Sequence, residues 1–146
     1  MRFAKDNIDA IKRHAIAPLN GPRAILERAT EIERGMDLLA AARRGDATGV
    51  EDLKRLSAPL NYRDPRTGAT PLHYVAAYNA RPAFRALTKG GGCDYLIRDK
   101  KGRLAWELAV DADDPAMARL MIYKTRRQAE ANGLPFPPRR PARTKN

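Results

Sequence analysis

The sequence contains few of the residues from which metal centres and disulfide frameworks are built. It has one cysteine, Cys93, and two histidines, His14 and His73, in 146 residues. A single cysteine cannot form an intramolecular disulfide, and a zinc site with several cysteine ligands is excluded. We therefore expect neither a disulfide-stapled fold nor a metal or other cofactor.

Long apolar segments are also missing. No window approaches the roughly 20 consecutive apolar residues that cross a bilayer. The first 18 residues do not resemble a secretory signal, because their apolar stretch is only Ala15–Ala17 and charged residues are scattered through the rest. We expect a cytoplasmic protein with no membrane partner, and the lone cysteine is compatible with a reducing compartment.

Positive charge is abundant. Lys and Arg number 28 against 17 Asp and Glu, which gives a net charge of +11, and hydrophobic residues still make up 43% of the chain. This composition is typical of one globular domain with a modest core rather than a disordered chain. The charge predicts attraction to an acidic protein, a nucleic acid or an acidic membrane surface.

The spacing of apolar residues predicts helices over most of the chain. We expect helices over residues 3–17, 22–34, 36–44 and 47–57. Pro22 suits the first turn of the second helix, and Gly35 is expected to end it as a left-handed cap.

An internal repeat organises the middle of the sequence. Gly68 and Gly102 are 34 residues apart, and each follows an Asp and precedes a short apolar helix and then a second helix. Residues 38–63 contain the same order of Ala-rich helix, glycine and apolar helix. The sequence thus predicts three units of similar design.

The segment Thr70-Pro71-Leu72-His73, preceded by Gly68 within a period near 33, resembles the ankyrin repeat. The resemblance covers residues 36–127; the first unit lacks the opening hairpin, and the third has Leu-Ala-Trp-Glu in place of the motif. It implies an all-α solenoid of stacked helix-turn-helix units with short hairpin loops, preceded by an N-terminal helical cap. Thr70 suits an N-cap and Pro71 the first helical position. In the family, this histidine ties the loop to neighbouring backbone.

Three segments follow from this assignment: an N-terminal helical cap over 1–35, an ankyrin-repeat domain over 36–130 and a disordered basic tail, rich in Pro and Arg, over 131–146. We expect deletion of residues 1–34 to cause aggregation or unfolding, because the cap would cover the first repeat. The tail is a solvated end, a basic arm for phosphates or a proline-rich ligand for an aromatic groove.

The resemblance also implies a contact surface. Ankyrin proteins commonly bind partners through the hairpin tips and the exposed ends of the inner helices. Transferred position by position, this predicts a basic, concave partner-binding face that contains one aromatic residue: Arg43, Arg44, Arg66, Tyr78, Lys100, Lys101 and Arg103. Exposed loop tips are commonly polar in any case, which is the plainer interpretation of the same residues.

Catalytic chemistry finds little support. His73 and Cys93 lack an acidic residue at a spacing suited to orient them, and we expect His73 to be structural. Gly90–Gly92 lacks the Lys-Ser/Thr of a phosphate loop and suits a helix end. Asp111, Asp113 and Asp114 lack the ligand order of a calcium loop, and we interpret them as a solvated turn. We expect Trp106 to serve in core packing or capping, and the chain not to be an enzyme.

The functional hypothesis is a monomeric, non-catalytic module that binds an acidic surface of another protein. One alternative is weak, salt-dependent and sequence-indifferent nucleic-acid binding through the basic face and tail. Another is a small regulatory or inhibitory subunit of an enzyme. The fold alone does not separate these hypotheses.

Overall fold

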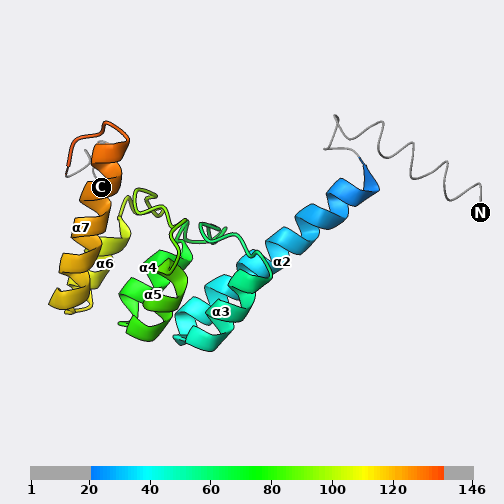
Figure 1. The fold of residues 1–146 in the computed structure, drawn as a ribbon, viewed down its shortest axis with the longest axis horizontal. Helices are drawn as coiled ribbons and strands as arrows, with labels where there is room; N and C mark the ends of the chain where they lie inside the picture. The colour runs from blue at the N-terminus through cyan, green and yellow to red at the C-terminus, as the bar shows by residue number, and fades with distance from the viewer. Residues whose placement is uncertain (1–20, 137–146) are drawn as a thin grey trace, which may run out of the picture. The chain divides into compact units, whose positions relative to one another are not determined.

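The computed structural model describes residues 21–136, and this part of the chain is all helical, with six helices and no strand (Figure 1). The expected all-α class is confirmed at this level. The helices are α2 (Pro22–Arg44), α3 (Ala47–Arg55), α4 (Pro71–Ala77), α5 (Arg81–Thr88), α6 (Ala105–Asp111) and α7 (Pro115–Ala131). The helix predicted over 3–17 and the tail from residue 137 lie outside the described residues.

The helix end predicted at Gly35 is wrong, because α2 continues without a break from Pro22 to Arg44. Gly35 is buried, and a Cβ atom added to it would lie 2.4 Å from Cγ of Tyr62. The absence of a side chain therefore allows the Tyr62 ring to approach the helix. The chain divides into two compact parts between Glu33 and Arg34, within α2. The packing and the sites described below belong to the second part, which begins at Arg34.

The helices of this second part pack in pairs. Helix α4 packs against α5 and α6, α3 packs against α5, and α6 packs against α7. Small side chains let these helices approach closely, and fully buried larger ones fill the space between them. The largest fully buried apolar side chains are Leu38, Val50, Leu72, Val75, Leu87, Leu104 and Met121.

Left-handed turn residues recur every 34 positions. Gly45, Asn79 and Asp113 have φ values of 69°, 54° and 59°, and each lies shortly before a helix. Ser57 and Gly91 form a second such series, and Gly68 and Gly102 a third. Glycine, asparagine and aspartate tolerate this conformation better than most residues. The same backbone turns are thus built with different side chains in successive units.

Hydrogen bonds join residues that are about one period apart. The Asn79 side chain donates to the Ala112 carbonyl at 3.3 Å, and the Lys54 ammonium donates to the Ala86 carbonyl at 2.8 Å. Asn61 accepts from the Asp94 N–H at 2.8 Å. Segments about one period apart are therefore joined by polar contacts as well as by the shared apolar core.

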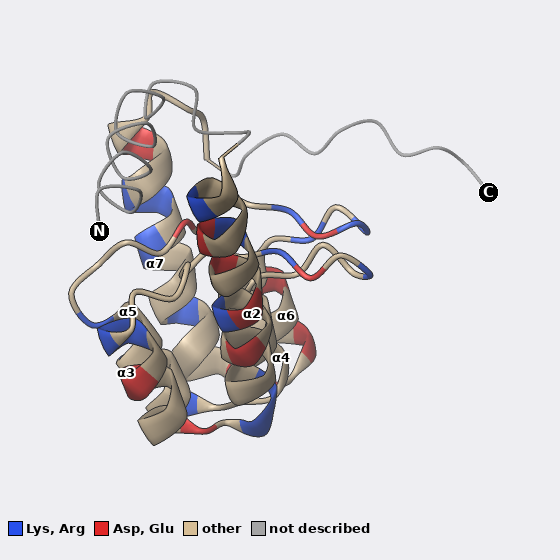
Figure 2. Cartoon of the chain, turned by 90° about the vertical axis from the view of Figure 1, so that its right-hand side faces the viewer, with Lys and Arg blue, Asp and Glu red and all other residues tan. Residues whose placement is uncertain are grey.

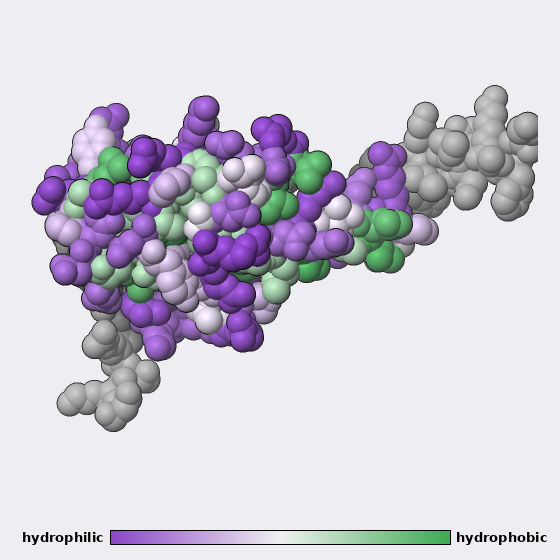
Figure 3. Space-filling model, turned by 90° about the horizontal axis from the view of Figure 1, so that it is seen from below, coloured by the Kyte–Doolittle hydropathy of each residue, from purple (hydrophilic) through white to green (hydrophobic). Residues whose placement is uncertain are grey.

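The face drawn in Figure 3 is mainly hydrophilic where residues are coloured, and its exposed apolar residues lie in small groups. Within the described residues, no helix combines the length and the apolar character that crossing a membrane requires.

Candidate functional site

Two neighbouring loops carry most of the predicted contact residues. In the first loop the Asp64 N–H donates to the Ala69 carbonyl at 2.8 Å, and in the second the Asp99 N–H donates to the Arg103 carbonyl at 3.0 Å. The Lys100 N–H donates to the Thr67 carbonyl at 2.9 Å, which links the two loops directly. Figure 2 shows basic and acidic residues next to one another in the two loops that project from the helices.

A buried carboxylate organises the second loop. Asp99 accepts hydrogen bonds from the N–H groups of Lys101 and Arg103 at 3.0 and 2.9 Å, and from Nε of Arg103 at 2.9 Å. Burial raises the pKa of Asp99, but the hydrogen bonds and charge of Arg103 outweigh it, and the pKa lies below its usual value. The carboxylate therefore stays ionised and holds the Arg103 guanidinium in place.

Asp64 has the same task in the first loop. It accepts a hydrogen bond from the Tyr74 hydroxyl at 2.7 Å, which is the largest cause of its lowered pKa, and one from the Arg66 N–H at 2.9 Å. The Arg66 guanidinium lies 3.9 Å from Asp64, and its side chain is 78% exposed. Arg66 is thus anchored by its backbone while its charge remains in solvent.

His73 connects helix α4 to the second loop. Thr70 is the N-cap of α4, and the Thr70 N–H donates to Nδ1 of His73 at 3.2 Å. Nε2 of the same ring lies 2.9 Å from the Arg103 carbonyl, so this nitrogen carries the proton in the neutral ring. The expected tie between His73 and neighbouring backbone is present. Burial lowers the pKa of His73, which favours the neutral form.

An aromatic and cationic cluster lies beside the loops. The Tyr74 and Tyr78 rings are nearly parallel, with centroids 6.5 Å apart, and the Arg43 guanidinium lies 5.5 Å from the centre of the Tyr74 ring. Tyr78 is 60% exposed. Because the Tyr74 hydroxyl also bonds Asp64, this cluster and the first loop form one network.

The remaining predicted residues differ in their surroundings. The Lys100 ammonium donates to the Pro65 carbonyl at 2.6 Å, whereas the exposed Lys101 ammonium has no partner in the described part of the chain. Arg44 pairs with Asp46 at 3.4 Å in an exposed ion pair. Such pairs contribute little to stability, so this arginine can exchange its partner at low cost.

Sequence reasoning missed Tyr74, the residue that joins Arg43, Tyr78 and Asp64. The signal was available, because Tyr74 and Tyr78 are four residues apart and therefore lie on the same side of a helix. The ring contact with Arg43 was not visible in the sequence, since that residue belongs to another helix.

The interpretation of the aspartate cluster as a solvated turn is wrong for Asp114. Its side chain is 4% exposed, accepts from the Met117 N–H at 3.2 Å as the N-cap of α7, and binds Arg81 with Nε at 3.0 Å. Asp111 and Asp113 are exposed. The physical reason is that a capping carboxylate beside a helix end can be buried when an arginine from the preceding unit neutralises it.

The other candidate groups have structural surroundings. Cys93 is buried, its thiol lies 3.6 Å from the Leu87 carbonyl, and burial raises its pKa to about 11. Gly90, Gly91 and Gly92 follow the end of α5 and all have positive φ values. Trp106 packs against the core, with its indole N–H buried and without a partner in residues 21–136. In the same part of the chain no group of three or more metal-binding side chains occurs.

The sequence matches no model of a known protein family, and no curated protein matches it.

Proposed function

We propose that this chain is a non-catalytic protein-interaction module of the ankyrin-repeat type. The recurrence of left-handed turns every 34 residues, at Gly45, Asn79 and Asp113, supports a repeat origin. The hydrogen bonds between residues one period apart support a stack in which each unit depends on its neighbour.

The partner in this proposal is another protein with an acidic surface. It binds to a surface that we name the loop face: Arg43, Arg44, Arg66, Tyr78, Lys100, Lys101 and Arg103. Six of these residues are basic, and the carboxylates that contact them are Asp46, Asp64 and Asp99. Six positive charges against three negative ones leave the surface positive by three.

The observation that carries the proposal is the exposed Tyr78, which stacks on Tyr74; Tyr74 in turn contacts Arg43 and bonds Asp64 of the first loop. Aromatic residues and arginine dominate binding energy at protein interfaces. Asp64 and Asp99 hold the backbone of the two loops, so little backbone freedom is lost when a partner binds. The positive charges then contribute association rate and specificity more than affinity.

The test compares variants that remove this surface without disturbing the loops. Arg66→Glu with Lys101→Glu reverses two exposed charges, and Tyr78→Ala removes the exposed ring. Neither Asp64, Asp99 nor His73 is altered. The matched control is Arg85→Glu with Arg119→Glu, because both of these arginines are exposed, lie on other elements and give the same change in charge.

Partners captured by the wild-type chain are identified by quantitative mass spectrometry, and the affinity of each purified partner is measured by calorimetry. We expect an acidic partner whose affinity falls at least 10-fold for either loop-face variant and stays unchanged for the control. Equal affinity for the wild type and the folded loop-face variants would refute the proposal. If the partner is an enzyme, its activity with and without the chain tests the regulatory alternative.

A titration with random duplex and single-stranded DNA at two salt concentrations tests the nucleic-acid alternative. We expect no binding at either salt concentration. Binding that falls steeply with salt and needs Arg66 and Lys101 would favour phosphate recognition instead.

A further inference from the structure

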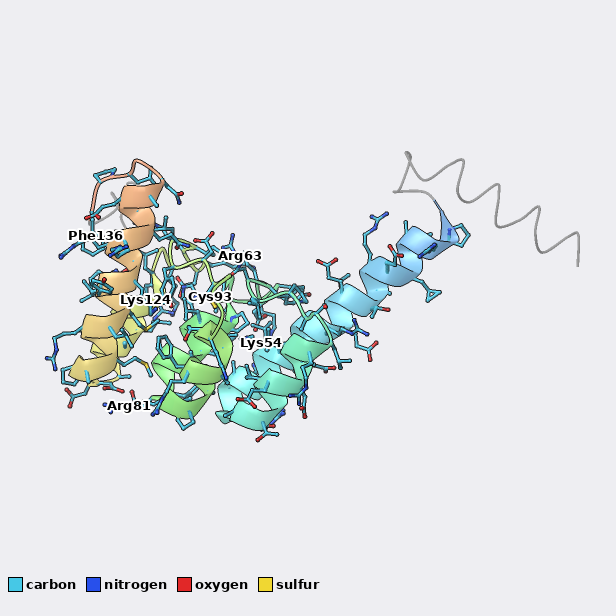
Figure 4. All side chains as sticks on the ribbon, viewed as in Figure 1. Lys54, Arg63, Arg81, Cys93, Lys124 and Phe136 are labelled. Atoms are coloured by element: carbon cyan, nitrogen blue, oxygen red, sulfur yellow. The ribbon has the colours of Figure 1, made fainter. Side chains whose placement is uncertain are left out.

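A concave surface that contains none of the loop-face residues lies between helix α7 and the turn that follows α5. Its volume is about 500 Å³, within the range of ligand sites in proteins. We name it the α7 groove; its walls include Tyr95, Tyr123, Lys124, Arg127, Gln128 and the backbone of Gly91 and Gly92. In Figure 4 Cys93 and Lys124 lie next to one another at this place.

The walls of the α7 groove are held together by one side chain. The Gln128 amide accepts from the Tyr95 N–H at 2.6 Å and donates to the Cys93 carbonyl at 3.2 Å. These two bonds attach the turn to α7. The groove is therefore preformed, which lowers the entropy cost of filling it.

The charges in the α7 groove are of one sign. Lys124 and Arg127 are three residues apart on α7 and so point to the same side of the helix. No Asp or Glu is among the residues that line the groove. The Arg127 guanidinium donates to the Tyr123 hydroxyl at 3.1 Å, and this hydrogen bond leaves its charge uncompensated. Burial raises the pKa of Cys93 to about 11, so its thiol is neutral and adds no negative charge to the groove.

Tyr95 adds a donor that nothing in the described part of the chain uses. Its side chain is only 8% exposed and lines the α7 groove, yet its hydroxyl has no hydrogen-bond partner within residues 21–136. A phenol hydroxyl donates one hydrogen bond, which an oxygen atom of a ligand in the groove can accept.

We propose that the α7 groove binds an acidic peptide segment of a partner protein, with a carboxylate held by Lys124, Arg127 and the Tyr95 hydroxyl. The rings of Tyr95 and Tyr123 provide the apolar surface for the rest of the segment. The chain's own tail is a poor occupant, because residues 137–146 carry four basic and no acidic side chains. The proposal uses none of the loop-face residues and does not depend on their function.

The test uses a fluorescein-labelled peptide of alternating Glu and Gly with one central Leu, and fluorescence anisotropy. We expect saturable binding to the wild type, and at least 10-fold weaker binding to Lys124→Gln with Arg127→Gln. Arg85→Gln with Arg119→Gln removes the same charge elsewhere and should bind as the wild type does. Tyr95→Phe should weaken binding about 3-fold, the effect of one lost hydrogen bond.

Two further measurements distinguish peptide binding in the α7 groove from general charge attraction and from binding of a free oxyanion. The loop-face variant Arg66→Glu with Lys101→Glu should bind the peptide with unchanged affinity. Equal losses of affinity in that variant, in the α7 variant and in the control would show general charge attraction and overturn the proposal. Urea unfolding of each variant establishes that it is folded.

The second measurement adds inorganic phosphate to the isotope-labelled chain and follows the amide signals of Gly91 and Gly92 by NMR. Phosphate should leave these signals unchanged. Shifts equal to those caused by the peptide would assign the groove to a free oxyanion instead.

Discussion

Both ring nitrogens of the buried His73 are hydrogen-bonded to backbone groups. One nitrogen accepts from Thr70 at the start of α4, and the other donates to the Arg103 carbonyl in the next loop. Protonation of Nδ1 would replace an acceptor with a donor that faces the Thr70 N–H. The same ring therefore caps a helix and makes the link between two units sensitive to pH.

Stability should fall as the pH drops below about 6.5, the ordinary value for histidine. The pKa of folded His73 is lowered by burial, so the unfolded chain takes up its proton first; the contribution is complete above pH 6.5 and is lost below it. Urea unfolding at pH 7.5 and 5.5 measures this. His73→Gln keeps an acceptor for the Thr70 N–H but does not titrate, and its loss over this range should be smaller. An equal loss in both proteins would assign the effect to other groups.

At the scale of the loops, Gly68 and Gly102 have the same role but different surroundings. Both have positive φ values. A Cβ atom added at Gly68 would lie 2.9 Å from the Lys100 backbone nitrogen, whereas a Cβ atom added at Gly102 would have no neighbouring atom within 4 Å in the described part of the chain. The first loop is therefore held against the second, and the second is open on its outer side.

Gly102→Ala should destabilise the chain by about 1–2 kcal/mol, the cost of a left-handed residue with a side chain. Gly68→Ala carries the same cost and in addition displaces Lys100, so its loss should be larger. Chemical unfolding of the two single variants measures the difference. Equal losses would mean that the contact between the loops adds nothing to stability.

Among the helices, α2 depends on Gly35 for its contact with Tyr62. Glycine within a helix is less favourable than alanine by about 1 kcal/mol. The contact is close enough that an added methyl group would overlap the base of the Tyr62 ring. Two effects of opposite sign therefore compete at this position.

Gly35→Ala should destabilise the wild type, because the Tyr62 ring cannot shift without losing its packing. In a Tyr62→Ala background the same substitution should stabilise the chain, by up to about 1 kcal/mol. A double-mutant cycle of unfolding free energies tests this reversal of sign. Stabilisation in both backgrounds would show that the ring yields easily.

On the scale of the whole molecule, the contacts between units predict cooperative unfolding. Asp114 in the last unit is bound to Arg81 in the middle one, and Asn61 in the first connection is bound to the Gly92 carbonyl at 3.0 Å. Buried side chains from all six helices, α2 to α7, belong to one hydrophobic cluster. A change in the first unit should therefore be felt in the last.

Leu38→Ala should lower the stability reported by Trp106 by about 2–5 kcal/mol, the usual cost of such a cavity. Leu38 is fully buried in the first unit, whereas Trp106, the single tryptophan, lies in the last. Urea unfolding followed by tryptophan fluorescence measures the transition of the last unit. A transition that does not move would show that the units unfold independently.

Much of the local structure was predictable from residue chemistry. Thr70, Pro71 and the two glycines 34 residues apart predicted a capped helix and a repeated turn, and all of them adopt the expected conformations. The repeat was harder to trace at Asn79 and Asp113, because these residues form the same left-handed turn as Gly45 without being glycine. The helix end at Gly35 was wrong, because a glycine's local tendency does not reveal a ring from a distant segment.

Caps, turns and the periodic burial of small residues depend on neighbours within a few positions, so the chain's own order of residues was enough to predict the helical class and the 34-residue spacing. Residues from different helices or loops meet in the aromatic cluster of Arg43, Tyr74 and Tyr78, in the ion pair of Arg81 with the buried Asp114, and in the α7 groove. Their existence depends on burial and on distances that packing sets, and the free energy of such contacts is not encoded in any one segment. Folding brought these groups together, and the aromatic cluster and the α7 groove belong to the proposed binding surfaces.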